Sequence, residues 1–314
     1  MIEQLKIAKN MRNKRLMIDN KKIQSWYEKN KEFEKNIEEV NKKISLWLSD
    51  TTEEQKQILF KLFLNSRFYG KKNIFSRFRT WYEQIKDAGY NIYTAIESQK
   101  YRHNSSHMFL YEFTLAVDVS EDDIKHSLKY MSVDEVKYVD NIIMMDDIIG
   151  TGKTVIDFFN SILEYLSGKT VYLWVLCCTE EALYKLKEYE SGIDFKLEIK
   201  YDRIEKKAFC KDYVFNEGEI EHKKEVIENF EKNLWKKRRK NKDEFILGKD
   251  DSQCLVSFYN DTPNNTLSSF WYEDEKRQAI FKRKIKKKNK STRLNSKKRK
   301  RREENYKAKE NGYV

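Results

Sequence analysis

Two adjacent carboxylates followed by a glycine- and threonine-rich turn have the clearest chemical character in this sequence. An apolar run at 142–145 ends at Asp146 and Asp147, and after two more apolar residues the turn 150–154 follows. Carboxylates can accept hydrogen bonds from the vicinal hydroxyls of a ribose and can help to hold a hydrated divalent cation. A turn that opens a helix offers backbone N–H groups to an anion. We therefore predict that Asp146 and Asp147 bind a ribose. The predicted 5-phosphate cradle comprises Gly150, Thr151, Gly152, Lys153 and Thr154.

Two other interpretations of this segment are considered. Gly-Lys-Thr at 152–154 also occurs in nucleotide-binding P-loops, but that motif needs a glycine where this sequence has Asp147. A carboxylate at that point would repel the phosphate, which argues against a Walker-type ATPase. In a purely structural interpretation, Thr151 caps the helix and the aspartates only end a strand.

The surrounding elements predict an α/β fold, with a mostly parallel twisted sheet flanked by helices. Candidate strands alternate with helical segments, a pattern typical of right-handed crossovers. The run 171–178 is apolar on both faces, as buried parallel strands are. This fold places Asp146 and Asp147 at the carboxyl end of a strand, where open α/β sheets bind ligands. Strands are expected at 91–96, 142–145, 171–178 and 193–201. Helices are expected in the first 90 residues, with a capping box at 50–54, and at 219–240 and 272–288. The segment 245–271 is expected to be irregular.

A polar loop at 97–106 follows the first of these strands. Its basic and hydroxyl side chains could bind a diphosphate and cap the next helix. The candidate diphosphate ligands are Ser98, Lys100, Arg102, Ser105 and Ser106. An ordinary polar loop after a strand is the alternative.

The segment 260–271 has a signature of its own. It contains the single proline of the chain, Pro263, in a Thr-Pro-Asn-Asn turn. A fixed φ angle and Asx hydrogen bonds predict a rigid loop there. Asparagine offers a donor and an acceptor together, which suits the edge of a nucleobase. We expect Asn264, Asn265 and Thr266 to contact the acceptor substrate, whereas a structural turn with Trp271 in the core is the alternative.

The net charge of +12 is concentrated near the C-terminal end of the sequence. Residues 282–302 contain 14 Lys or Arg and no Asp or Glu, which leaves 49 basic and 51 acidic residues elsewhere. A second basic cluster occupies 236–240. Such runs attract the phosphates of nucleic acids by releasing counterions, so DNA or RNA is a candidate partner. A tail that only increases solubility would have the same composition.

Composition excludes several classes of protein. A hydrophobic content of 39%, with 14% aromatic residues, argues against a disordered chain. The longest apolar run, 171–178, is far shorter than the roughly 20 residues that span a bilayer. The start of the sequence lacks the apolar core of a signal peptide. The four cysteines have no paired metal-ligand spacing, so we expect buried thiols in a cytoplasmic protein without membrane contact.

Residues 141–154 resemble the phosphoribosyl-diphosphate (PRPP) signature of the type I phosphoribosyltransferases. That signature is a hydrophobic strand, two acids, two apolar residues and a Thr-Gly-x-Thr loop. The resemblance implies a five-stranded, mostly parallel sheet with a flexible loop and a variable hood over the acceptor. It also implies PRPP or a ribose-5-phosphate nucleotide as substrate, transfer or cleavage at ribose C1, and Mg²⁺ held by Asp146 and Asp147 through water. Purine-salvage members carry an aspartate where this chain has Gly150, so the motif does not identify a catalytic base.

With the segment 247–271, roughly residues 50–275 are similar to the phosphoribosyltransferase-CE family of bacterial conflict and antiviral systems, including some retron operons. This similarity implies an antiviral effector, with a reverse transcriptase or another defence-system subunit as partner. Two further functions stay open: a non-catalytic module that senses PRPP or a nucleotide, and a nucleic-acid-associated subunit docked through its basic tail. The expected organisation is a helical extension at 1–48, a phosphoribosyltransferase-like domain with its hood at 49–275, and a basic helical or disordered tail at 276–314.

Overall fold

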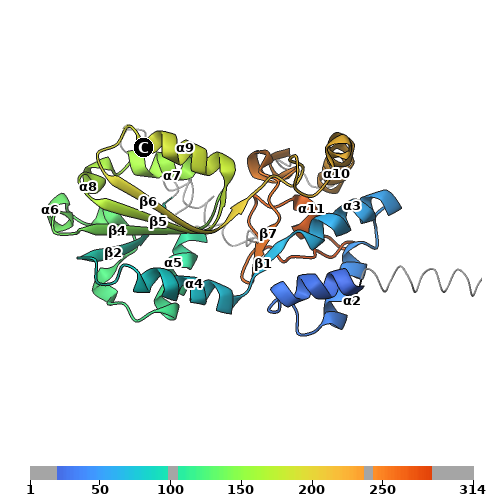
Figure 1. The fold of residues 1–314 in the computed structure, drawn as a ribbon, viewed down its shortest axis with the longest axis horizontal. Helices are drawn as coiled ribbons and strands as arrows, with labels where there is room; N and C mark the ends of the chain where they lie inside the picture. Colours follow the sequence, from blue (N-terminus) through green and yellow to red (C-terminus); the bar gives the residue numbers. More distant parts are fainter. Residues whose placement is uncertain (1–19, 98–104, 237–242, 285–314) are drawn as a thin grey trace, which may run out of the picture. The chain divides into compact units, whose positions relative to one another are not determined.

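Five parallel strands form the central sheet (Figure 1). The computed structural model describes residues 20–97, 105–236 and 243–284. The strands are β2 (Asn91–Ala95), β3 (Ile124–Lys125), β4 (Asn141–Ile149), β5 (Thr170–Thr179) and β6 (Lys196–Glu205). Their order is β3-β2-β4-β5-β6, and Asp146 of β4 lies opposite Val175 of β5. The predicted α/β class and the mostly parallel sheet are confirmed.

Helices cover both faces of the sheet (Figure 1). One face carries α7 (Lys153–Asn160), α8 (Leu163–Leu166) and α9 (Glu180–Glu190), and the other carries α4 (Lys71–Glu83) and α5 (Ser105–Ala116). Side chains of β4 alternate between the two layers: Ile142 and Met144 pack with the first set of helices, Ile143 and Met145 with the second. Because both faces are buried, β4 and β5 are apolar almost throughout.

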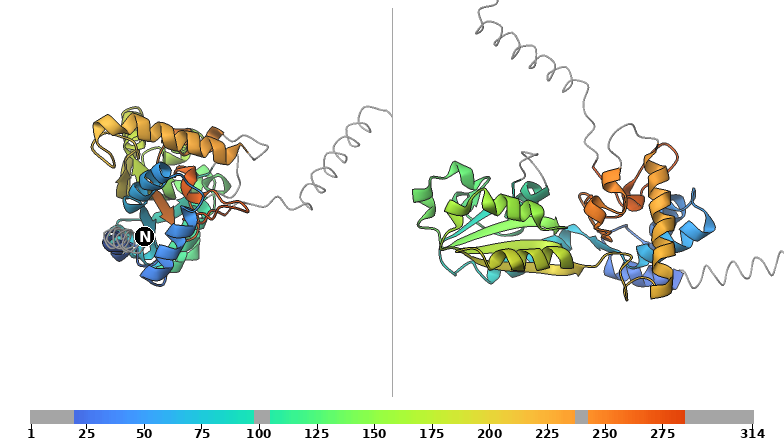
Figure 2. Two further views of the ribbon diagram at one scale, coloured as in Figure 1. Left: turned by 90° about the vertical axis from the view of Figure 1, so that its right-hand side faces the viewer. Right: turned by 90° about the horizontal axis from the view of Figure 1, so that it is seen from above.

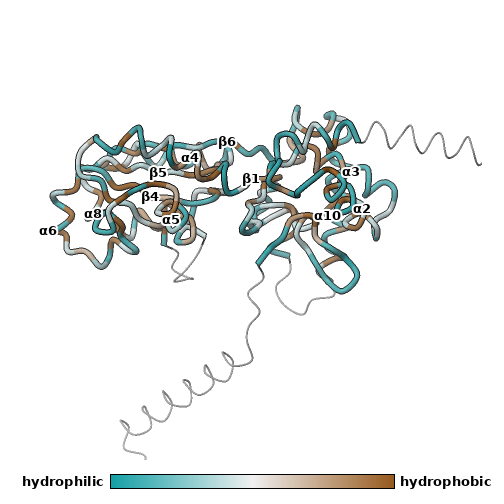
Figure 3. The backbone as a smooth tube through the Cα atoms, turned by 90° about the horizontal axis from the view of Figure 1, so that it is seen from below, coloured by the Kyte–Doolittle hydropathy of each residue, from teal (hydrophilic) through white to brown (hydrophobic). Residues whose placement is uncertain are grey.

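The hydropathy of the residues agrees with this burial of the sheet between two layers of helices (Figure 3). Hydrophobic colour runs along β4 and β5 in the middle of the sheet. Within the described ranges, no helix combines the length and the apolar character that crossing a bilayer requires.

A second hydrophobic cluster joins segments from the two ends of the described chain. Helical residues 20–29, α2 (Ile37–Trp47) and α3 (Glu53–Leu64) pack with α10 (Ile220–Trp235) and α11 (Ser268–Trp271) (Figure 2). The Trp47 indole donates to the Ser269 carbonyl at 2.8 Å, and the buried Arg277 guanidinium pairs with Asp50 at 2.5 Å. A short parallel pair, β1 (Arg67–Tyr69) and β7 (Val256–Phe258), contributes Phe68 to this cluster and Tyr69, Val256 and Phe258 to the layer that contains α4 and α5. We refer to the described residues after β6, 206–236 and 243–284, as the hood.

Some local predictions were wrong. Residues 67–69 form β1 inside a stretch that was predicted to be helical, because their partner β7 comes from the distant hood. The capping box of α3 uses Thr52 and Gln55 instead of a carboxylate. No helix forms over 272–284: Asp274 accepts the N–H groups of two following residues in a turn, and the next apolar residues, Ile280 and Phe281, are buried in the second cluster. The remaining predicted helical residues, 285–288, lie outside the described residues.

Candidate functional site

Asp146 and Asp147 lie in the last part of β4. Their side chains are half-buried, whereas the five preceding residues of the strand are buried. The Ser105 hydroxyl, at the first residue of α5, donates to an Asp146 carboxylate oxygen at 3.2 Å. The same oxygen accepts the Asp147 N–H at 2.9 Å. The strand therefore brings two carboxylates to a partly exposed position beside the start of α5.

The two carboxylates are held at an electrostatic cost. Burial and the neighbouring charge of Asp147 raise the pKa of Asp146 well above its ordinary value. Burial also raises the pKa of Asp147, and the Asp261 carboxylate of the hood contributes to this shift. Hydrogen-bond donors or a cation would relieve this repulsion, and ribose hydroxyls or hydrated Mg²⁺ would supply them.

The donor set at this position fits a magnesium ion that keeps its water. Mg²⁺ prefers oxygen ligands, and it is commonly held by one or two carboxylates together with substrate phosphates. Asp146 and Asp147 supply such oxygens. Across the described part of the chain, no group of three or more His, Cys, Asp or Glu side chains could hold a metal ion. Magnesium binding by these two residues stays a prediction.

The turn after the acids begins α7 without a side-chain cap. Gly152 is the N-cap residue, and its φ of 73° lies in the left-handed region that favours glycine. Because no side chain caps this helix, the interpretation in which Thr151 acts as the cap is wrong. N–H groups at such a helix start are suited to bind an anion. Gly150 and Thr151 are half-buried, while Lys153 and Thr154 are exposed.

Only part of the predicted diphosphate loop belongs to the residues that the structure describes. Ser98, Lys100 and Arg102 lie outside the described residues. Ser105 is exposed beside Asp146, as described above. Ser106 is fully buried; its hydroxyl accepts the Ile96 N–H at 2.6 Å and donates to the Met145 carbonyl, so it joins the residue that follows β2 to β4.

The three predicted hood residues have different surroundings. Thr266 is fully buried, and its hydroxyl donates to the Val256 carbonyl at 2.5 Å. Asn264 contributes its carbonyl, which accepts the Lys249 N–H at 2.7 Å. The Asn265 carboxamide lies against Gly150: it supplies the three atoms nearest to a Cβ placed on that glycine. The structure thus brings Asn265 to the turn that follows the acids.

Sequence reasoning missed two residues that contact or influence this site. The Thr179 hydroxyl donates to the Gly150 carbonyl and also accepts the Ala182 N–H at 3.1 Å, so the end of β5 holds the turn. Asp261 acts on Asp147 through its charge. Asp261 could have been noticed because it precedes Pro263 in the segment that the sequence singles out; Thr179 had only its place after a strand.

The hood turn that carries Asp261 is fastened to α5. The buried carboxylate of Glu112 accepts hydrogen bonds from the Tyr259 hydroxyl at 2.8 Å and from the Asn260 amide at 2.6 Å. Hydrogen bonds to a charged, buried acceptor are among the stronger ones in proteins. Glu112 therefore fixes one end of the 259–266 segment to α5.

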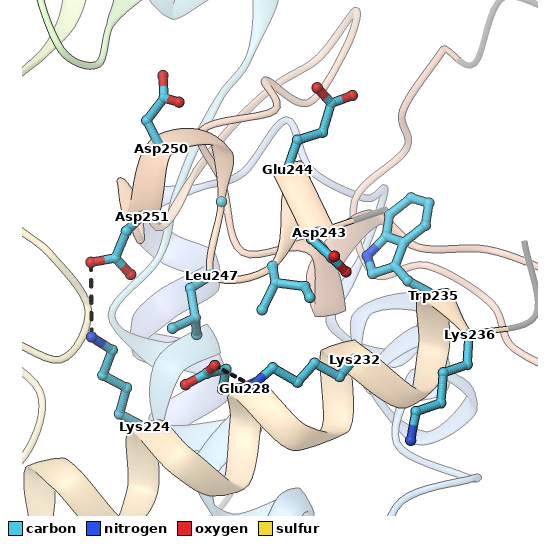
Figure 4. Close-up of a pocket in the computed structure, with 12 residues that line it drawn as sticks. Lys224, Glu228, Lys232, Trp235, Lys236, Asp243, Glu244, Leu247, Asp250 and Asp251 are labelled. Atoms are coloured by element: carbon cyan, nitrogen blue, oxygen red, sulfur yellow. Dashed lines mark ion pairs between the residues drawn. The ribbon is translucent and has the colours of Figure 1, made fainter. Parts of the chain in front are cut away.

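A cavity of about 770 Å³ lies within the hood, between α10 and residues 243–251 (Figure 4). None of the predicted ribose, phosphate or acceptor residues lines it. Four of its charged side chains form two ion pairs, Lys224 with Asp251 at 3.8 Å and Lys232 with Glu228 at 2.5 Å. Lys236, from the basic cluster 236–240, also lines this cavity, whereas 237–240 and 285–302 lie outside the described residues. The paired charges give no reason to assign an anionic ligand here.

Comparison with known proteins adds a family. The family model PRTase-CE matches residues 44–283, which include the acids, the turn and most of the hood. No curated protein matches the chain. Among solved structures, the AQ2163 protein from Aquifex aeolicus is similar over 56% of this chain and 87% of that chain, with 14% identity and a TM-score of 0.29.

Proposed function

Because the chain belongs to the PRTase-CE family, we propose that it binds PRPP or a ribose-5-phosphate nucleotide with β4 and the turn after it. The chain is a phosphoribosyltransferase-like protein. The observation that carries the proposal is the arrangement around Asp146 and Asp147: two half-buried carboxylates whose pKa values burial raises, followed by a helix start that no side chain caps. Sugar hydroxyls and a 5-phosphate would satisfy both features at once.

Each part of this site has a task in the proposed chemistry. The carboxylates of Asp146 and Asp147 accept hydrogen bonds from the ribose hydroxyls and orient C1. The N–H groups at the start of α7 hold the 5-phosphate, and Thr179 fixes the Gly150 carbonyl by donating a hydrogen bond to it. When bound, Mg²⁺ would offset the charge of the diphosphate. Transfer breaks the bond from C1 to the leaving group and forms one to a nucleophile of the acceptor.

Titration calorimetry with Mg²⁺ and PRPP tests the binding site. We expect the wild-type protein to bind, and the double variant Asp146→Asn/Asp147→Asn to lose at least about tenfold in affinity, since each lost charge-assisted hydrogen bond contributes roughly 1.5–3 kcal/mol. Asp122→Asn/Asp123→Asn is the matched control, because it removes an adjacent aspartate pair outside the site and should bind as the wild type does. Equal affinity of all three proteins would refute the assignment.

Pyrophosphate release then separates an enzyme from a sensor. A transferase releases pyrophosphate from PRPP when one of a panel of bases is added, and it forms the corresponding nucleotide. A module that binds PRPP but releases none with any base would be the non-catalytic alternative. The pair variant serves as the blank in both cases.

We extend the proposal to a role in antiviral defence, which the resemblance to conflict-system proteins supports. If the protein acts on cellular nucleotides or PRPP, their levels change when it is active. Metabolite profiling of cells that express the wild type or the Asp146/Asp147 pair variant, with and without phage infection, measures this. Identical profiles under infection would argue against such an effector function.

A further inference from the structure

The hood contacts the turn after β4 at Gly150. A Cβ on this residue would overlap the Asn265 carboxamide, whose Cγ and Oδ1 lie 3.1 and 3.7 Å from that position. The Asn265 side chain thus occupies the space that a side chain at position 150 would take. This space adjoins both the acid pair and the proposed phosphate cradle, because Gly150 is the first residue of the cradle and follows Asp147 by three residues.

The backbone of Asn265 is held firmly in place. Its carbonyl accepts hydrogen bonds from the Ser252 hydroxyl at 2.8 Å and from the Cys254 N–H at 3.0 Å. Both donors belong to the segment 247–254, which we call the clamp. A Cβ at Gly248 in this clamp would also lie only 2.9 Å from the Asn265 carbonyl carbon, so the two backbones pack closely.

The clamp has an unusual backbone conformation. Four non-glycine residues in it have left-handed φ angles, namely Leu247 (56°), Asp250 (56°), Asp251 (54°) and Gln253 (49°). Such conformations each carry a cost and persist where surrounding contacts impose them, often near functional sites. In this chain they allow the clamp to fold around residues 264 and 265.

The Asn265 carboxamide itself is not used to hold the fold. It is half-buried, and it makes no hydrogen bond to any residue within 20–97, 105–236 and 243–284. Thr266, in contrast, is fully buried and bonded, and Asn264 contributes its backbone. A fixed amide with unused donor and acceptor groups, set beside a candidate sugar-phosphate site, is suited to recognise a ligand.

We propose that Asn265 reads the nucleobase of a ribonucleoside 5′-monophosphate, or of the free base that becomes one, while residues 146–154 hold the ribose 5-phosphate. The planar amide offers an N–H donor and a C=O acceptor side by side, which pairs with a base edge that presents the complementary groups. The absent side chain at Gly150 gives the amide its room. This inference rests on the proposed function and adds to it the residue that sets the specificity for the base.

Calorimetric titration of the full chain with ribose 5-phosphate, AMP, GMP, CMP and UMP tests the inference without requiring turnover. We expect at least one nucleotide to bind more tightly than ribose 5-phosphate. In Asn265→Ala the affinity for that nucleotide should fall at least about tenfold, the size of one good base contact, while the affinity for ribose 5-phosphate changes less than about twofold. Asn265→Asp, which has nearly the same shape but lacks the N–H donor, should lose affinity for the same nucleotide.

Two further variants complete the test. Gly150→Ala should weaken binding of the same nucleotide, because its methyl group displaces the carboxamide. Asn216→Ala, which replaces an exposed asparagine elsewhere in the hood, is the matched control that should bind as the wild type does. Thermal unfolding of each variant verifies that it is folded. If the wild type binds neither ribose 5-phosphate nor any nucleotide, the proposed function itself fails. If it binds them and both Asn265 variants keep the wild-type affinities, or lose ribose 5-phosphate equally, the role of Asn265 in reading the base is refuted and the sugar-phosphate site stands.

Discussion

At the scale of single residues, the candidate site stores unfavourable electrostatic energy in the ligand-free protein. Asp146→Asn keeps an oxygen that can accept from Ser105 but removes a charge that is disfavoured by burial and by repulsion from Asp147, the two causes that raise the pKa of Asp146. We expect the free energy of unfolding of this variant at neutral pH to be higher by roughly 0.5–2 kcal/mol, as is common when a strained functional residue is replaced. The variant should therefore unfold at a higher temperature. Differential scanning calorimetry measures this. An unchanged or lower midpoint would contradict the repulsion argument.

The pH dependence of this effect has a definite sign. Because the folded-state pKa of Asp146 is raised, the wild-type protein binds a proton more readily when folded than when unfolded. Its stability relative to the Asn variant therefore increases as the pH falls from neutral, through the raised pKa, toward the ordinary carboxylate value of about 4. Calorimetry at pH 7 and pH 5 should show the advantage of the variant shrinking at the lower pH.

The acids and the turn could be predicted because their chemistry is local. A buried strand, two carboxylates and a glycine turn are adjacent in the chain, and the parallel sheet decides which end of the strand they occupy. Asn264 and Asn265, in contrast, have the same side chain and differ only in what the fold places next to them. The choice between them depends on the distant clamp and on Gly150, which no local pattern specifies.

At the scale of elements, correct predictions depend on local sequence patterns, and wrong ones concern segments whose conformation depends on distant contacts. The strands β4 and β5 are long, apolar and buried on both faces, so their sequences alone identify them. The three-residue strands β1 and β7 exist because they pair with each other across most of the chain. The charged stretch 272–284 looked helical, but burial of Ile280 and Phe281 against the second cluster decides its conformation.

Helix α10 holds the clamp through one buried carboxylate, which gives an element-level prediction. Glu231 is fully buried and accepts the Leu247 N–H at 2.6 Å and the Ser269 N–H at 2.7 Å. In Glu231→Gln, an NH₂ group replaces one carboxylate oxygen and faces a backbone N–H group, whose hydrogen bond it cannot accept. We therefore expect the substitution to destabilise the protein by about 2–4 kcal/mol, as loss of a buried charged acceptor does. We also expect weaker nucleotide binding, because Leu247 begins the clamp that holds Asn265.

Glu228→Gln on the same helix is the matched control. Glu228 pairs with Lys232 one turn away, where both side chains keep contact with solvent. Such pairs contribute about 0.3–0.5 kcal/mol, so urea unfolding should hardly distinguish this variant from the wild type. Equal effects of the two substitutions would mean that the buried carboxylate does not hold the clamp.

At the scale of the whole molecule, most of the basic run follows the last residues that pack in the described fold. The hydrophobic cluster that includes α2, α3, α10 and α11 continues to Ile280 and Phe281, and the Lys282 carbonyl accepts the Thr262 hydroxyl at 2.7 Å. Eleven of the 14 basic residues in 282–302 follow Lys284. A truncation after residue 284 therefore removes most of the basic run and none of the described contacts, whereas one after residue 275 also removes the buried Arg277 and its pair with Asp50.

These two truncations test whether the basic region docks the protein on nucleic acid. Removal of residues 285–314 should leave the thermal midpoint nearly unchanged, whereas removal of 276–314 should destabilise the protein severely, because it uncovers a cluster that contains Trp47 and Phe270. For nucleic-acid binding, we measure the anisotropy of a labelled mixed-sequence duplex from 50 to 200 mM salt. The affinity of the full chain should fall steeply as the salt concentration rises. In the truncation after 284, the slope of log affinity against log salt should become shallower by roughly 0.9 for each phosphate contact removed. If the shorter chain kept both the affinity and the slope of the full chain, the basic run would have no docking function, and contacts elsewhere in the protein would account for the binding.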